Sequence, residues 1–353
     1  MKILITADIH NGVPGKLKDT LWSMQIIQDY ANKNGIDTVL ILGDLFHNRE
    51  NLNIEVLNGV YDQLSRLEDL EQEWICFPGN HDIFLKDSWR INSLRPLENI
   101  LTTHESISNF KIGNRRFWVL PFIYYEDRYN EELSKIEEEY KDGDILLTHI
   151  GVNNATLNEC FLLKNWSFID FTNSKFKRVF TGHFHCHQSV GENVIYPGSP
   201  IPFRFDEGLV DHGFIVFDII DDSWEFVKIF DICGEFSDYV APDYLTVEAK
   251  DILKVDLKDN NIKIILNKDF TLDELSQLRS ALSAKGALDI KWDKQFKKAD
   301  EIEQIDEPID ESDLFSKWVE HDNPEGYKKD LLFELHDGIA KEAEELISRE
   351  TEE

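Results

Sequence analysis

The sequence has few cysteines and no long apolar run. Its cysteines are far apart and form no C-x-x-C pair, so neither a disulfide framework nor a thiolate zinc site is expected. No apolar stretch approaches the roughly 20 residues that cross a bilayer, and the apolar start of the chain ends at Asp8, which argues against a secretory signal. We therefore expect a protein of the reducing cytoplasm with no membrane partner. The four cysteines are Cys76, Cys160, Cys186 and Cys233.

The sequence also lacks a basic excess. Lys and Arg total 37 against 68 Asp and Glu, which gives a net charge of −31. A protein that binds nucleic acid alone usually has a basic face, so at a DNA site bound metal ions or a partner would have to supply positive charge. Residues 300–353 contain 20 Asp and Glu but only 5 Lys and Arg, so this segment is distinct from the rest of the chain.

What the sequence does have is an alternation of short apolar runs and amphipathic segments. The apolar runs 2–7, 36–42 and 74–77 predict buried strands, and the segments 17–34 and 53–70 between them predict helices. This β-α-β-α-β beginning, followed by many short strands, predicts an α/β fold in which mixed sheets pack face to face with helices outside. The later elements expected are strands at 115–120, 145–148, 178–181, 194–196, 213–219 and 224–230, and a charged helix at 131–142.

A domain boundary is expected near Ala241-Pro242. Residues 1–240 would form the main domain. Residues 243–298 would form a small α/β unit with strands at 262–266 and 288–292 and a helix that begins at Thr271. Residues 299–353 would be an acidic linker followed by C-terminal helices, the second of which has an apolar stripe from Leu331 to Leu346.

Five clusters of polar side chains follow the predicted strands. Ligand sites of open α/β sheets lie where strands end and loops begin, so these clusters are expected to meet. Their carboxylate, amide and imidazole groups suit Mn²⁺, Fe²⁺ or Zn²⁺ better than Ca²⁺. A lone histidine is usually a structural residue, but five such clusters predict a metal site. The clusters are Asp8-Ile9-His10, Gly43-Asp44, Gly79-Asn80-His81-Asp82, Thr148-His149 and Gly182-His183-Phe184-His185.

The order of these motifs (D-x-H, G-D, G-N-H-D, H and G-H-x-H) resembles that of the calcineurin-like metallophosphoesterases over residues 1 to about 230. The resemblance implies the αββα sandwich of that superfamily and two divalent metal ions. Two cations roughly 3.5–4 Å apart need a shared carboxylate between them. The sequence departs from the family at Thr148, where glycine is common. Matched by motif, Asp8, His10 and His185 would hold one ion, Asn80, His149 and His183 would hold the other, and Asp44 would bridge them.

The same resemblance assigns catalytic roles to three further residues. His81 would hydrogen-bond the phosphate and protonate the leaving oxygen, and Asp82 would orient His81. His47 would face the substrate; the alternative for it is a surface loop histidine. His187 continues the alternation of His183 and His185, but the family motif stops at the second histidine.

A narrower resemblance is to the SbcD-type DNA-repair nucleases, which include phage recombination endonuclease subunits. Gly43-Asp44-Leu45-Phe46-His47 is similar to their second motif, and Tyr196–Phe203 is similar to their loop after the last histidine motif. In layout, residues 243–298 resemble their capping domain, and the C-terminal helices resemble the region that binds the SbcC-type coiled-coil ATPase. The resemblance implies a Mn²⁺-dependent exonuclease on double strands and endonuclease on single strands, a homodimer, and a location in the cytoplasm, or in the host cytoplasm if a phage encodes the chain.

Two other functions compete with this interpretation. A phosphatase or small-molecule phosphodiesterase could use the same core, and release of nucleotides from double-stranded DNA would separate it from a nuclease. A scaffold without metals is the other, and metal analysis of the purified chain would decide. Candidate DNA contacts, which could equally be scattered solvated charges, are Lys86, Arg90 and Arg95 near Trp89, Arg115 and Arg116, and Lys175, Lys177 and Arg178.

Overall fold

The computed structural model describes residues 1–86, 88–158, 161–162, 169–208, 210–249, 251–252, 254–255, 257–266 and 271–294. The predicted C-terminal helices lie outside these residues, as does Cys160. Within the described part, no helix has both the length and the apolar character needed to cross a membrane.

Two six-stranded sheets form the centre of the main body. Across the first sheet the strands lie in the order β16 (Ser223–Lys228), β15 (Gly213–Asp218), β1 (Lys2–Thr6), β2 (Thr38–Ile41), β3 (Glu73–Cys76) and β6 (Thr102–Thr103). Across the second the order is β13 (Gln188–Val190), β14 (Val194–Tyr196), β12 (Val179–Gly182), β9 (Ile145–His149), β8 (Arg115–Leu120) and β7 (Ser108–Ile112).

The sheets pack face to face through a shared apolar core. Ile5 and Leu40 of the first sheet belong to the same buried cluster as Phe117, Leu147 and Phe180 of the second. The residues that alternate with these point to the outer faces, because successive side chains of a strand lie on opposite sides. Each sheet thus has an apolar face toward its partner and a second apolar face toward helices.

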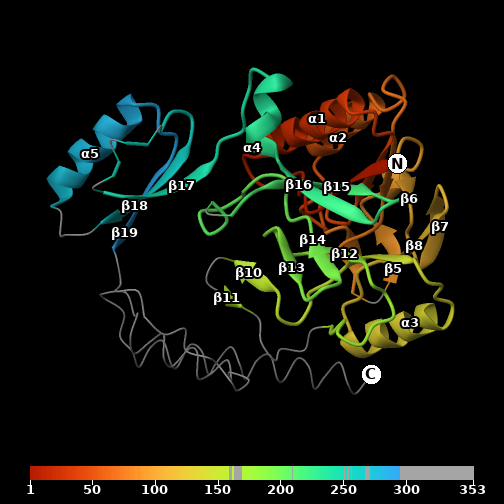
Figure 1. Cartoon of the computed structure of the whole chain (residues 1–353). Helices are drawn as coiled ribbons and strands as arrows, with labels where there is room; N and C mark the ends of the chain where they lie inside the picture. The colour runs from red at the N-terminus through yellow and green to blue at the C-terminus, as the bar shows by residue number, and fades with distance from the viewer. Residues whose placement is uncertain are drawn as a thin grey trace, which may run out of the picture. The chain divides into compact units, whose positions relative to one another are not determined.

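Helices cover both outer faces (Figure 1). Helices α1 (Leu17–Lys33) and α2 (Ile54–Ser65) pack on the first sheet in one buried cluster. Helix α3 (Glu126–Glu138) packs on the second sheet through Tyr129, Leu133 and Ile136, which recur at spacings of four and three. The result is an αββα sandwich, as expected from the sequence.

Two predicted boundaries were wrong. Helix α3 begins at Glu126 rather than at residue 131, because acidic side chains in its first turn extend it toward the N-terminus. The strand expected at 224–230 ends at Lys228, and residues Ile229–Ile232 form the short helix α4, followed by a 3-10 turn at Cys233–Glu235. Ile229 and Cys233 there join a buried cluster with Trp22 and Ile201, so tertiary packing ended the strand.

Residues 244–294 form the small α/β unit with its own apolar core. Three parallel strands, β17 (Tyr244–Glu248), β18 (Asn261–Leu266) and β19 (Ile290–Lys294), accompany helix α5 (Leu272–Ala284). Thr271 caps this helix, since its hydroxyl accepts from the backbone N–H of Glu274. The boundary near Ala241-Pro242 remains a prediction. Two minor hairpins, β4 (Ile83–Leu85) with β5 (Ser88–Asn92) and β10 (Thr156–Asn158) with β11 (Phe161–Leu162), and a 3-10 turn (Arg95–Leu97) complete the described elements.

Candidate metal centre

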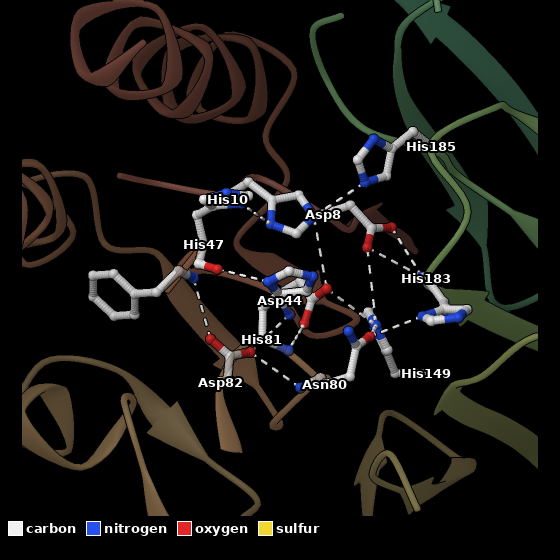
Figure 2. Close-up of polar contacts among 12 residues, drawn as sticks. Asp8, His10, Asp44, His47, Asn80, His81, Asp82, His149, His183 and His185 are labelled. Atoms are coloured by element: carbon white, nitrogen blue, oxygen red, sulfur yellow. Dashed lines mark hydrogen bonds and ion pairs between the residues drawn. The ribbon is translucent and has the colours of Figure 1, made fainter. Parts of the chain in front are cut away.

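The polar clusters meet because the strands that carry them run parallel. β1, β2 and β3 pair in parallel, and so do β8, β9 and β12. Their carboxyl ends therefore lie at one edge of the sandwich, where the loops of both sheets converge. Figure 2 shows the resulting group of side chains, with Asp8, Asp44 and Asn80 from the first sheet and His149 and His183 from the second.

One half of the group contains His10 and His185. Their Nε2 atoms lie 3.0 Å apart, and His10 Nε2 lies 3.6 Å from Asp44 Oδ2. Asp8, His10 and His185 each offer a donor atom within 4.8 Å of the others. A carboxylate and two imidazoles at this spacing could hold one divalent cation.

The other half contains Asn80, His149 and His183. Asn80 Oδ1 lies 2.9 Å from His149 Nε2 and 2.8 Å from His183 Nδ1. His149 Nε2 is also 3.4 Å from Asp44 Oδ2. Asp44 thus reaches both halves through Oδ2, which is the place that a bridging carboxylate would occupy.

The chemistry of these groups fits cations. Burial raises the pKa of Asp8 to about 6. Burial also lowers the pKa of His183 to about 3 and that of His10 well below its usual value. Burial opposes a charge on His149, but Asp44 outweighs burial and raises the pKa of that ring to about 9, so positive charge at the centre balances the buried carboxylates. The residues present are therefore suited to divalent metal ions.

The backbone at the centre is held in an unusual conformation. Four of the eight non-glycine residues with positive φ in the described part are among the candidate ligands: Asp8 (54°), His10 (53°), Asp44 (54°) and His183 (101°). Each such residue costs roughly 1–3 kcal/mol, and such strain gathers at functional sites. The surrounding fold therefore fixes these side chains at a conformational cost.

Glycines leave the space that the cluster needs. A Cβ on Gly79 would lie 2.2 Å from Asp44 Oδ1, and a Cβ on Gly182 would lie 2.4 Å from the carbonyl oxygen of Leu42 and 2.7 Å from His149 Nδ1. A Cβ on Gly43 would lie 2.6 Å from the same His149 atom. The close approach of neighbouring atoms therefore requires glycine at these positions before the candidate ligands.

Asp82 has a different role from the one suggested by the sequence. Its carboxylate accepts hydrogen bonds from the backbone N–H groups of Asp44 (2.7 Å), Phe46 (3.1 Å) and Gly79 (3.0 Å), and from the hydroxyl of Ser93 (3.0 Å). The prediction that Asp82 orients His81 was therefore wrong. Asp82 ties the loop that carries Asp44 to the loop that carries Asn80, because its two oxygens can accept from several donors at once.

His81 is oriented instead by His47. His81 Nδ1 lies 2.6 Å from the carbonyl oxygen of His47, so Nδ1 carries the proton and Nε2 is left for a substrate. The His47 ring stacks on the His81 ring at a centroid distance of 5.2 Å. His47 Nδ1 also lies 3.4 Å from His10 Nδ1, which helps to orient that ring. Nitrogen atoms of His10, His47 and His81 also converge, but this group contains no carboxylate that would balance the charge of a cation.

Glu207 is a residue of the site that the sequence did not reveal. Its carboxylate accepts from His185 Nδ1 (2.9 Å) and from the backbone N–H of Phe203 (2.7 Å), and its side chain is only 4% exposed. Burial would raise the pKa of Glu207, but the hydrogen bond and charge of His185 lower it to about 2. A carboxylate on Nδ1 presents Nε2 of the same ring to the centre. His212 holds the loop in turn, with Nε2 2.9 Å from the carbonyl oxygen of Glu207.

His187 lies outside the cluster. β12 ends at Gly182, so residues 183–187 form a loop and do not alternate as the sequence suggested. The His187 ring stacks on Phe226 with centroids 3.8 Å apart, and Nδ1 donates to the carbonyl of Tyr196. Its contacts are those of a structural residue. Cys186 is buried.

Most of the candidate DNA-binding cations lie at the opposite end of the strands. β8 begins at Arg115 and β12 begins just after Arg178, whereas the metal centre lies at the other ends of these strands. Arg116 pairs with Asp144, and Arg178 Nη2 lies 2.9 Å from Asp222. For these residues the structure favours fold-stabilising ion pairs.

Two cavities adjoin the metal centre. One, of about 320 Å³, is lined by His47, Asn48, Arg49, Glu50, Asn80 and His81. The other, of about 310 Å³, has Asn80 and His183 in its wall together with Arg49, Lys86 and the aromatic residues Phe122 and Tyr124. A substrate phosphate at the centre would therefore have space on both sides.

Comparison with known proteins gives one family. A model of the calcineurin-like phosphoesterase family matches residues 1–187. Among curated proteins, exonuclease subunit 1 of Enterobacteria phage T4 is 26% identical over 248 residues, which cover 64% of this chain and 67% of that protein. The uncharacterized protein R555 of Acanthamoeba polyphaga mimivirus is 25% identical over 207 residues, 55% of this chain and 15% of the viral protein. A putative phosphoesterase of invertebrate iridescent virus 3 is 24% identical over 190 residues, 50% of this chain and 51% of its own length.

Solved structures that match this chain include a nuclease and a dimetal phosphatase. Nuclease MPE of Pseudomonas putida is 14% identical with a TM-score of 0.28, and the match covers 54% of this chain and 65% of that one. A dimetal phosphatase of Danio rerio is 11% identical with a TM-score of 0.35, over 61% of this chain and 91% of that one. Likenesses at this level do not distinguish a nuclease from a phosphatase.

Proposed function

Because the chain belongs to the calcineurin-like phosphoesterase family, we propose that it is a metal-dependent DNA nuclease, an exonuclease on double strands and an endonuclease on single strands. The observation that carries the proposal is the convergence of seven oxygen- and nitrogen-bearing side chains from five strand ends on one spot. Membership of the family makes the chain a phosphoester hydrolase. The name of its phage T4 relative, an exonuclease subunit, supports DNA as the substrate.

Two divalent metal ions are the proposed cofactors, with Mn²⁺ as the expected metal. Asp8, His10 and His185 would hold one ion and Asn80, His149 and His183 the other, with Asp44 shared. When bound, the ions supply Lewis-acid stabilisation of the charge that develops on a phosphodiester. They also supply the positive charge that a chain of net charge −31 lacks at a DNA site.

The chain's own residues position the substrate and move a proton. His81 Nε2 is free of the contact that Nδ1 makes with His47, and His81 lines the cavity beside the centre. We assign to the imidazolium form of His81, which has a second proton on Nε2, the hydrogen bond to the phosphate and the donation of that proton to the leaving oxygen. His47 lines the same cavity, faces the substrate there and keeps the His81 ring in place. Asp82 fixes the two loops between which the phosphate would lie.

The proposal includes partners. The acidic charge suits a subunit whose partner binds most of the duplex, and an SbcC-type coiled-coil ATPase docked on the helices predicted for residues 299–353 would be that partner. The word "subunit" in the name of the phage T4 relative supports an assembly. We also propose a homodimer, and a location in the cytoplasm or, for a phage-encoded chain, in the host cytoplasm.

The decisive experiment compares wild type with His81→Ala in Mn²⁺, with and without a coiled-coil ATPase subunit. Wild type should release nucleotides from double-stranded DNA. The variant should keep both metal ions by elemental analysis and lose cleavage by about 10²- to 10⁴-fold, the usual contribution of a general acid. The matched control is His187→Gln, which should cleave normally because His187 packs outside the cluster.

Two outcomes would contradict parts of this proposal. Cleavage by His81→Ala at the wild-type rate would remove the role assigned to His81. Hydrolysis of phosphate monoesters without release of nucleotides from DNA would favour the phosphatase alternative instead.

A further inference from the structure

The cavity beside Asn80 and His183 has features that the metal chemistry does not explain. Its volume of about 310 Å³ is at the lower end of the range for small-molecule sites, roughly 300–1,000 Å³. Ile83 and Ile169 are buried in its walls. A phosphate needs no apolar wall, so this cavity is built for another part of the substrate.

Two aromatic residues give the cavity flat apolar surface. Phe122 lies against the His183 ring with centroids 5.9 Å apart, so it adjoins the metal centre directly. Tyr124, two residues later, is 50% exposed although it is aromatic. Exposed aromatic rings beside a phosphodiester site are what nucleobases stack on, whatever the base, because every base has a π-face.

The aromatic wall is held in place. Trp89 of strand β5 donates its Nε1–H to the carbonyl oxygen of Phe122 at 2.7 Å. This bond ties the β4–β5 hairpin, which follows Asn80 and His81 in the chain, to the loop after β8. A wall fixed before binding costs less ordering entropy when the ligand arrives.

Two cations border the same cavity. Lys86 Nζ lies 4.4 Å from the centre of the Tyr124 ring. Arg49 is exposed and lines both this cavity and the one that contains His47 and His81. In a chain of net charge −31, cations placed here are suited to the phosphates that flank a bound nucleotide.

We propose that this cavity takes the base of one unpaired nucleotide, the neighbour of the scissile phosphate on the Asn80–His183 side, stacked on Phe122 and Tyr124. The inference rests on the proposed nuclease function. A base inside a duplex is held by its partner and its stack, so it enters such a cavity only from a single strand, a frayed end or a flipped position. The substrate class is therefore DNA with an unpaired nucleotide at the cut.

The test uses the full chain with Mn²⁺ and end-labelled single-stranded oligonucleotides that contain one tetrahydrofuran abasic residue. Wild type should cut the bond beside the abasic residue about 5- to 150-fold more slowly than the other bonds of the same strand, the range that loss of one base–aromatic stack gives. Equal cutting at every bond would overturn the proposal.

Variants identify the residues. Tyr124→Ala and Phe122→Leu should cut intact DNA more slowly at all bonds and should show a reduced difference at the abasic position. Phe122→Leu keeps apolar volume beside His183, so its metal content should match wild type. The control is Tyr61→Ala, a tyrosine of α2 that is 38% exposed and does not line the cavity; it should behave as wild type. A full abasic effect in both cavity variants would refute the assignment.

A second measurement separates this inference from the nuclease proposal. Thymidine 5′-monophosphate and 2-deoxyribose 5-phosphate are compared as inhibitors of bis(4-nitrophenyl) phosphate hydrolysis. Stronger inhibition by the nucleotide, lost in Tyr124→Ala, supports the base cavity even if no DNA is cut, in which case only the nuclease proposal fails. DNA cleavage without any preference for the nucleotide refutes the cavity and leaves the nuclease standing.

Discussion

Replacing Glu207 with glutamine changes the charge of the site and little else. The side chain keeps its length and shape, but it has one accepting oxygen in place of two. In the structure both carboxylate oxygens are occupied: one accepts from His185 Nδ1 at 2.9 Å and the other from the backbone N–H of Phe203 at 2.7 Å. A glutamine can satisfy only one of these donors, and its own NH₂ faces the other.

The consequence for metal binding follows from the tautomer of His185. If the glutamine NH₂ faces His185, Nδ1 must become the acceptor and the ring proton moves to Nε2. That nitrogen can then no longer bind a cation. Loss of such a supporting partner lowers metal affinity by about 10- to 100-fold. Only one ion should weaken, because His185 belongs to one half of the cluster and Asn80, His149 and His183 form the other.

The assay is calorimetric titration of the metal-free chain with Mn²⁺. Wild type should bind two ions, and Glu207→Gln should bind one normally and one about 10- to 100-fold more weakly. The matched control is Asp206→Asn, which removes the same charge from the adjacent, 45% exposed side chain and should titrate as wild type. Two unchanged affinities in Glu207→Gln, with a normal melting temperature, would refute this account of His185.

Three further predictions concern space, stability and charge. Gly79→Ala should lose bound metal and activity, because the added Cβ would lie 2.2 Å from Asp44 Oδ1. The control Gly234→Ala should keep both, since no atom would lie within 4 Å of its Cβ. Measuring the metal content of the two purified variants checks this. Asp144→Asn should lower the free energy of unfolding by about 1–3 kcal/mol at pH 7, because the side chain keeps one accepting oxygen for Trp118 Nε1 but loses the negative charge that pairs with Arg116. Burial opposes ionisation of Asp144, but Arg116 outweighs burial and lowers the pKa of the carboxyl group. The stability difference between wild type and the variant should therefore be full above pH 3.8, the pKa in the unfolded chain, and should shrink as the pH falls below that value. Denaturant melts at several pH values test this, and a stability difference that does not change with pH would contradict it. Lys86→Ala should reduce the slope of log affinity against log salt concentration for single-stranded DNA by about 1. The control Lys177→Ala removes a cation that pairs with Asp142 at the far end of β12, and it should leave this slope unchanged. Fluorescence anisotropy measures both slopes.

Local patterns were enough to predict most elements of the sandwich, although the strands at Thr102–Thr103 and Ser108–Ile112 were missed. Strands 2–7, 36–42 and 74–77 and the first two helices appear within a few residues of their predicted limits, because each has its own apolar period and its own stop. The short helix at Ile229–Ile232 was missed, since its apolar residues have no clear period and its packing against Trp22 comes from a distant part of the chain. The early start of α3 was readable in principle, because Tyr129, Leu133 and Ile136 already follow a helical spacing.

By itself the sequence determined which residues are available for the metal centre, because polar clusters that follow parallel strands lie at the carboxyl edge of their sheet. The packing of the two sheets then brought the edge with Asp8, Asp44 and Asn80 to the edge with His149 and His183. Only the tertiary structure decided what orients them. Glu207 lies 22 positions from His185 in a loop with no motif, and Asp82 bonds to loops rather than to the histidine beside it. Such contacts depend on how loops from separate strands approach each other, and local sequence periodicity carries no information about that distance.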